Sequence, residues 1–199
     1  MNKPYSQACE NNKVFILPLL ADSFQNSKTL LEVGSGTGQH AVYFAANMPW
    51  LSWQTSDVIE NHHGINQWLN ECSARNLLAP FALDLNNPWP ITLVDAIYTA
   101  NTLHIVSWPL VQAFFQGVSQ HLAKDGKCCI YGPFNYQGKF TSESNANFND
   151  WLKERDTESA IRDFEAICEL ATQAGLQLEN DHEMPANNRL LVFTKNYIV

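Results

Sequence analysis

Apolar residues along the chain form short runs that alternate with helical patterns. The predicted strands are residues 29–33, 51–57, 81–85, 93–98 and 127–131. Between them, apolar positions recur at the three- and four-residue spacing of amphipathic helices. The predicted helices cover residues 6–20, 39–46, 65–72, 107–122 and 160–174. Such alternation predicts an α/β protein with a parallel sheet and helices on both of its faces.

The end of the chain has a different pattern. The stretch from Leu176 to Met184 and the run 190–193 predict two strands, and Asn187-Asn188 forms the short turn between them. The last strand should therefore run antiparallel to the others. A Rossmann-like seven-stranded sheet, mostly parallel and closed by a C-terminal antiparallel hairpin, is the class I methyltransferase fold. At 199 residues without repeats or linkers, we expect one domain over 1–199.

The first predicted strand leads into a glycine-rich loop, Gly34-Ser35-Gly36-Thr37-Gly38. Glycines at every second position let the backbone turn tightly and approach a ligand, and the next helix offers free N–H groups. The dinucleotide fingerprint requires a glycine at position 39, where this chain has Gln39. The carboxylate of Glu32, two residues before the first glycine, would repel a pyrophosphate. The pattern favours a ligand with a cationic ammonium and no phosphate, such as S-adenosylmethionine (SAM).

Polar residues follow the ends of the next strands, where open α/β sheets bind their ligands. Asp57 is placed to accept both ribose hydroxyls, and Asp84 to accept from an adenine amino group beside the N–H of Leu85. Asn101 could meet the amino acid part of the cofactor, while His40 could contact its carboxylate or cap the loop. Aspartates of this kind also suit turns and N-caps. Their occurrence at successive strand ends beside the glycine loop favours a cofactor pocket.

The candidates for chemistry are fewer, because methyl transfer needs an aligned nucleophile and only sometimes a base. His104 is the best candidate base, since an imidazole can be neutral at pH 7. The alternative, which we favour, is that His104 packs beside the cofactor or bonds a loop carbonyl. Tyr131 could orient an acceptor. The motif Asn101-Thr102-Leu103-His104 stands where enzymes that methylate exocyclic base nitrogens carry Asp-Pro-Pro-Tyr or Asn-Pro-Pro-Tyr, which argues against DNA amino methylation.

A long polar connection, residues 135–162, follows the fifth strand and is expected to be a functional lid. Phe140, Phe148 and Trp151 give it an apolar side that could close on a bound molecule. Arg155 and Arg162 could clamp a carboxylate or phosphate of the substrate. Alternatively, the segment is a solvated helix on which the arginines pair with nearby acids. The candidate substrate-binding residues are Asn135, Ser144, Asn145, Arg155 and Arg162, with Asn187 and Asn188 from the hairpin turn.

Composition excludes several classes of function. A net charge of −8 and a pI near 5.1 argue against binding to nucleic acid. There is no membrane-length apolar run or N-terminal signal, and five irregularly spaced cysteines suggest a reducing compartment. We therefore expect a cytoplasmic protein without a membrane partner. His62-His63 lacks metal-ligand spacing, so no metal site is expected. The oligomeric state stays open.

Over its whole length the chain resembles a family of uncharacterised bacterial proteins similar to the eukaryotic methyltransferase-like protein 26. The resembling blocks are Lys3-Pro4 through Asn11-Asn12, Leu31 to Gly38, Tyr131-Gly132-Pro133-Phe134, Ser144-Asn145, Phe148, Arg155-Asp156, Arg162-Asp163 and Met184-Pro185-Ala186-Asn187-Asn188. The resemblance implies a class I SAM-dependent methyltransferase fold and supplies no acceptor.

The predicted function is SAM-dependent methyl transfer to a small molecule. One alternative is a non-catalytic protein that binds SAM for sensing. The other is a nicotinamide-dependent oxidoreductase, since Asp57 would also suit the ribose of NAD. The missing glycine at position 39 and the lack of room for a substrate domain speak against it.

Overall fold

A seven-stranded sheet forms the centre of the computed structural model, which describes residues 3–196. The strand order is β3-β2-β1-β4-β5-β9-β8. The strands are β1 (Thr29–Val33), β2 (Ser52–Asp57), β3 (Leu77–Ala82), β4 (Val94–Ala100), β5 (Leu122–Gly132), β8 (Leu176–Met184) and β9 (Asn188–Lys195). Strands β1 to β5 pair in parallel, whereas β9 is antiparallel to both β5 and β8. The predicted fold with its C-terminal hairpin is confirmed.

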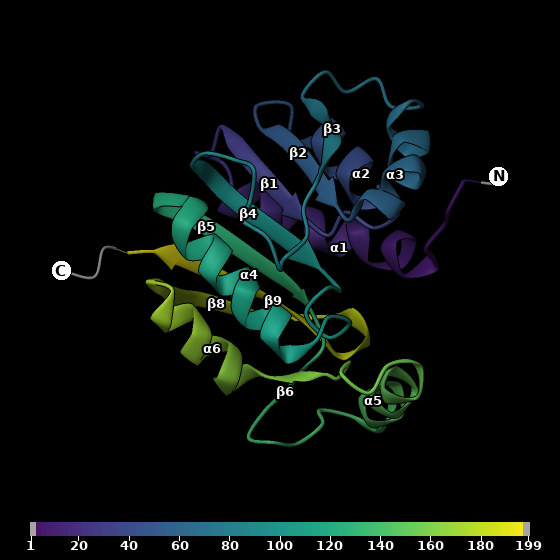
Figure 1. The fold of residues 1–199 in the computed structure, drawn as a ribbon, viewed down its shortest axis with the longest axis vertical. Coiled ribbons are helices and arrows are strands. Elements are labelled where there is room, and N and C mark those ends of the chain that lie inside the picture. The colour runs from purple at the N-terminus through teal and green to yellow at the C-terminus, as the bar shows by residue number, and fades with distance from the viewer. Residues whose placement is uncertain (1–2, 197–199) are drawn as a thin grey trace.

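Helices cover both faces of this sheet (Figure 1). On one face lie α1 (Gln7–Ser23) and α2 (Gln39–Asn47), with α3 (His62–Leu69) beside α2; on the other lie α4 (Trp108–His121) and α6 (Phe164–Gln173). Each face buries its own apolar cluster, and alternate side chains of a strand serve different clusters. Cys128 therefore packs on the α4 side and Cys129 on the α1 side, as their adjacency predicts.

The third strand differs from its prediction. It spans Leu77–Ala82 rather than 81–85, and so includes Pro80. Proline has no N–H to donate, which normally interrupts a strand. However, β3 is the edge strand of the sheet and pairs only with β2, so one side of its backbone needs no partner. Asp84 consequently lies beyond the strand, in the turn that follows it.

The connection predicted as a lid contains regular structure of its own. The helix α5 (Glu143–Arg155) occupies its middle, with Ser142 as the N-cap whose hydroxyl accepts from the Asn145 N–H. Strands β6 (Phe134–Asn135) and β7 (Arg162–Asp163) pair across its two ends. The helix predicted at 160–174 therefore begins later, at Phe164, because the residues before it belong to β7 and its approach.

Gly117 makes room within α4 for the indole ring of Trp89, which is 6 % exposed. A Cβ on Gly117 would lie 2.2 Å from two atoms of that ring. Glycine in a helix is ordinarily about 0.5–1 kcal/mol worse than alanine. Here we expect the opposite sign: Gly117→Ala should lower the free energy of unfolding by about 1–3 kcal/mol through overpacking. Urea unfolding measures this effect. The loss should shrink in a Trp89→Leu background, and an unchanged loss there would contradict the stated cause.

Candidate functional site

A cavity of about 850 Å³ lies at the carboxyl ends of the parallel strands. It is lined by the glycine loop, the start of α1, the ends of β2 and β4, α5 and the hairpin turn. Figure 1 shows α5 apart from the helices that cover the sheet, on the side to which the arrows of β4 and β5 point. Ligands of open α/β sheets bind at this end of the strands. The cavity is therefore the candidate site.

Most of the predicted residues come together here. From the cofactor set, the residues that line the cavity are Glu32, Gly34, Ser35, Gly36, Thr37, His40, Asp57 and Asn101. From the acceptor and catalytic sets they are His104, Ser144, Asn145, Arg155 and Asn188. Cys9, Val58 and Thr102 also line the cavity and were not among the predicted site residues. Val58 and Thr102 directly follow the predicted Asp57 and Asn101, whereas only the fold brings Cys9 to the cavity.

The glycine loop has a conformation that requires glycine at two positions. Gly34 has a φ of 75°, and a Cβ there would lie 2.8 Å from the Thr102 hydroxyl oxygen. Gly38 has a φ of 87°, and its Cβ would lie 3.2 Å from the backbone of Ile65. The N–H groups of Gly34 and Ser35 both donate to the Ser56 carbonyl, at 3.1 and 2.9 Å. These contacts hold the loop against the end of β2.

Glu32 is a buried carboxyl group beneath this loop, with 2 % of its surface exposed. Its Oε2 accepts from the Ser35 hydroxyl at 2.8 Å and from the Trp53 indole N–H at 3.0 Å. Burial raises the pKa of Glu32 to about 7, although the two hydrogen bonds oppose this shift. Glu32 lines the cavity, so a cation placed there would face a carboxyl group that ionises near neutral pH.

Asp57 ends β2 and turns its carboxylate toward the glycine loop. Its Oδ2 accepts from the Gly36 N–H at 2.7 Å, and its Oδ1 accepts from the Val58 N–H and the Asn61 amide, both at 2.8 Å. A carboxylate has about four acceptor positions, so it can still accept from a ligand. Asp57 therefore has a fixed orientation and remaining capacity.

Gln39 connects the glycine loop to the beginning of α1. Its amide nitrogen donates to the Ser6 carbonyl at 3.3 Å and to Glu10 Oε1 at 2.9 Å, and its amide oxygen accepts from the Ser6 N–H. The start of α1 lines the cavity as a result. Next along the chain, His40 bonds Asn12 Oδ1 at 2.7 Å. Burial lowers the pKa of His40 to about 4, so its imidazole is neutral at pH 7.

His104 reaches the cavity from the loop after β4 and is 5 % exposed. Its ring meets that of Phe148 edge to face, with centroids 5.4 Å apart. Burial, and then the positive charge of Arg162, lower the pKa of His104 to about 4. Arg162 itself is buried and donates to the carbonyls of Leu103, Val106 and Glu158. Arg162 thus holds the loop that carries His104, instead of pairing with nearby acids.

Other predicted residues lie outside the lining. Asp84 is exposed and accepts from Asn86 and Asn87, which makes it a turn former here, while Leu85 packs against the α4-side cluster. Asn187 fixes α5 instead: its carbonyl accepts from the Asn145 amide at 3.2 Å.

Gly38 lies behind the loop, at the start of α2. Tyr131 is buried in β5, and burial raises its pKa, while the neighbouring Asn12 and Asn188 side chains lower it. Asn135 is buried as well, and its Oδ1 has no hydrogen-bond partner in the part of the chain that the structure describes.

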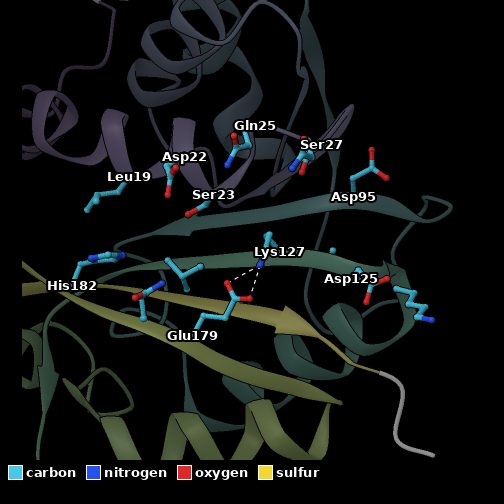
Figure 2. Close-up of a pocket in the computed structure, with 15 residues that line it drawn as sticks. Leu19, Asp22, Ser23, Gln25, Ser27, Asp95, Asp125, Lys127, Glu179 and His182 are labelled. Atoms are coloured by element: carbon cyan, nitrogen blue, oxygen red, sulfur yellow. Dashed lines mark hydrogen bonds and ion pairs between the residues drawn. The ribbon is translucent and has the colours of Figure 1, made fainter.

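A second cavity, of about 660 Å³, lies at the opposite end of the sheet (Figure 2). It is bordered by the end of α1 and by the starts of β4 and β5. Three of its charged side chains have partners within the protein: Lys127 lies 2.6 Å from both Glu179 oxygens, and Asp95 accepts from the N–H groups of Lys28 and Thr29. Without a glycine loop or strand carboxyl ends, this cavity does not match the predicted site.

Within residues 3–196, no three His, Cys, Asp or Glu side chains are grouped so that they could hold a metal ion. No helix there is both long and apolar enough to cross a membrane.

A family model described as "Protein of unknown function (DUF938)" matches residues 3–195. The chain belongs to this family. Several solved structures with a fold similar to that of the DUF938 chain are described as methyltransferases. An O-methyltransferase family protein from Burkholderia thailandensis gives a TM-score of 0.83 at 12 % identity, over 94 % of this chain and 57 % of that one. A putative O-methyltransferase from Nostoc punctiforme gives 0.81 at 14 %, over 95 % and 58 %.

Human N-acetylserotonin methyltransferase in complex with SAM is also similar to the DUF938 chain. Its TM-score is 0.80 at 14 % identity, over 96 % of this chain and 53 % of that one. At such identities the likeness shows the fold, which is that of SAM-dependent methyltransferases. The DUF938 chain spans a little over half the length of these structures.

Proposed function

We propose that this chain is a SAM-dependent methyltransferase that acts on a small molecule. The observation that carries the proposal is the joint placement of Glu32, Asp57 and the glycine loop around one cavity at the strand carboxyl ends. The SAM complex of the human protein with the same fold supports this choice of cofactor.

Each part of a SAM molecule has a complementary group in the cavity. Asp57 is suited to accept from both ribose hydroxyls, one at its free acceptor position and one in place of the exposed Asn61 amide, since the Gly36 and Val58 N–H groups hold it in place. Glu32 is suited to bind the ammonium group, because its Oε1 accepts no hydrogen bond from residues 3–196. Asn101 has a φ of 57° and lines the cavity, at the turn between the cofactor residues Glu32 and Asp57 and the part of the cavity proposed for the acceptor.

The chemistry asks little of the protein once both ligands are bound. Bound SAM supplies a methyl group on a positively charged sulfur. The residues of the cavity would hold the acceptor in line with that group and exclude water, which is the main source of rate in such transfers. His104, which is neutral at pH 7 but a weak base because its pKa is lowered, is suited to accept a hydrogen bond from the polar group of the acceptor. The volume of about 850 Å³ falls within the range of about 300–1,000 Å³ for small-molecule sites.

Titration calorimetry with SAM and S-adenosylhomocysteine (SAH) tests the cofactor. We expect both to bind with micromolar affinity, and NADH to give no heat because its pyrophosphate would face Glu32. Ligand at 100 times its Kd should also raise the free energy of unfolding by about 2.7 kcal/mol. A folded protein that binds neither SAM nor SAH would overturn the proposal. Transfer of a radiolabelled methyl group into cell-extract metabolites then distinguishes an enzyme from a SAM sensor.

A further inference from the structure

The helix α5 forms the side of the cavity that the cofactor residues leave open. The α5 residues that line it are Ser144, Asn145, Phe148, Trp151, Leu152 and Arg155. Their spacing places them along one face of a helix. The same cavity is lined by Glu32, Asp57 and the glycine loop. One face of α5 is thus continuous with the proposed cofactor site, at the position where an acceptor must lie.

Aromatic rings run along this face. Phe148 and Trp151 stack with centroids 5.6 Å apart and planes 19° apart. Trp151 is 46 % exposed, and both rings border the cavity. A flat ring that covers these exposed aromatic side chains is stabilised by the burial of apolar surface and by offset stacking. Residues 3–196 supply no such ring, because within them the Trp151 ring contacts only the Phe148 ring and the Arg155 guanidinium.

The two ends of this aromatic row differ in chemistry. At one end, His104 meets Phe148 edge to face, and neither ring nitrogen of His104 has a hydrogen-bond partner within residues 3–196. At the other end, the guanidinium of Arg155 lies 4.6 Å from the Trp151 ring centroid. Arg155 forms no ion pair with any residue in the described part of the chain. Its planar fork of N–H groups matches a carboxylate.

We propose that the acceptor is an extended flat aromatic carboxylate that lies along α5. Its rings stack on Phe148 and Trp151, its carboxylate pairs with Arg155, and the polar group that becomes methylated faces His104. The proposal rests on the proposed function, since it places the acceptor beside bound SAM. The successive separations of 5.4, 5.6 and 4.6 Å along His104, Phe148, Trp151 and Arg155 favour two fused rings over one.

Ligand-observed NMR and calorimetry on SAH-saturated protein test the acceptor class with defined probes. The probes are 2-naphthoate, 6-hydroxy-2-naphthoate, neutral 2-naphthol and non-aromatic cyclohexanecarboxylate. We expect 6-hydroxy-2-naphthoate to bind best, and cyclohexanecarboxylate not to bind. Arg155→Gln should weaken 2-naphthoate about tenfold or more and leave 2-naphthol unchanged. Trp151→Ala should weaken both about tenfold.

His104→Leu tests the other end of the row. It should remove the preference for 6-hydroxy-2-naphthoate over 2-naphthoate, because the hydroxyl loses its partner. The matched control is Lys153→Gln, which removes a positive charge from an exposed position of α5 outside the lining. This control should change no affinity. The SAH affinity of each variant shows that the protein is folded.

The outcomes separate the two proposals. If SAH binds and no aromatic probe does, or if Arg155→Gln and Lys153→Gln behave alike, the acceptor proposal is overturned while the proposed function stands. If the folded protein binds neither SAM nor SAH, both are overturned.

Discussion

Asp57→Ala should weaken SAM and SAH binding by about 100-fold or more. Each hydrogen bond to a charged group contributes about 1.5–3 kcal/mol, and the carboxylate is proposed to accept two from the ribose. Every 1.4 kcal/mol corresponds to a tenfold change in Kd. The substitution also leaves the Gly36 N–H without its acceptor, which loosens the loop that surrounds the cofactor. Calorimetry with SAH measures the combined loss.

Two further variants identify its cause. Asp22→Ala removes an exposed aspartate from the last turn of α1, at the end of the sheet far from the candidate site. A negative charge in that turn does not stabilise the helix, so its removal should leave both the fold and the SAH affinity unchanged. Asp57→Asn keeps one side-chain oxygen for the Gly36 N–H, and should give an intermediate loss. An Asp57→Ala protein that is folded and binds SAH as tightly as the parent would contradict the assignment of Asp57 to the ribose.

Glu32→Gln should stabilise the protein at high pH, by up to about 3 kcal/mol at pH 8. The pKa of Glu32 is about 7 in the folded protein and about 4.3 in an unfolded chain. Between these values the folded state keeps a proton that the unfolded state has lost. The contribution of protonated Glu32 therefore falls as the pH rises through this window, and glutamine removes the dependence. Urea unfolding at pH 5, 6.5 and 8 should show a growing advantage of the variant.

Two histidines provide a contrast in sign. His40 and His104 have pKa values lowered to about 4, so the folded state loses stability as the pH falls from about 6.5 toward 4. Both residues are present in parent and variant, so their effect cancels in the difference. A difference that does not change with pH would show that Glu32 is not a buried acid of raised pKa. The same variant should bind SAM more weakly, because it lacks the carboxylate proposed to hold the ammonium group.

Much of the sheet and the cofactor side was predictable because their signals are local. The predicted range of β1, 29–33, agrees with the structure, since buried apolar runs bounded by a glycine loop leave little freedom. The predicted range of β3 was wrong, because Pro80 interrupts the apolar pattern of a strand and only an edge strand tolerates a proline. The helix α5 was predicted only as the alternative to a lid and without bounds, because a polar face and a short aromatic row are compatible with either when read without the fold.

Contacts between distant segments were beyond the sequence. Arg162 had two predicted uses, a clamp for the substrate or an ion pair, and the structure shows a third, which is to hold three carbonyls. Asp84 was predicted at the same strand position as Asp57, yet it lies beyond the end of β3, and only Asp57 lines the cavity. Which of the two aspartates reaches the cavity depends on its position relative to the glycine loop. Strand register and turn length determine that position.

Gln39 links the choice of cofactor to the path of the N-terminal segment. A glycine at this position would complete the dinucleotide fingerprint, but it would also remove every side-chain bond that ties Ser6 and Glu10 to the loop. One substitution toward NAD binding thus also releases the start of α1 and its N-cap, which contribute Cys9 and Ser6 to the cavity. A change of cofactor specificity at this position would therefore also change the wall that the N-terminal segment gives to the cavity.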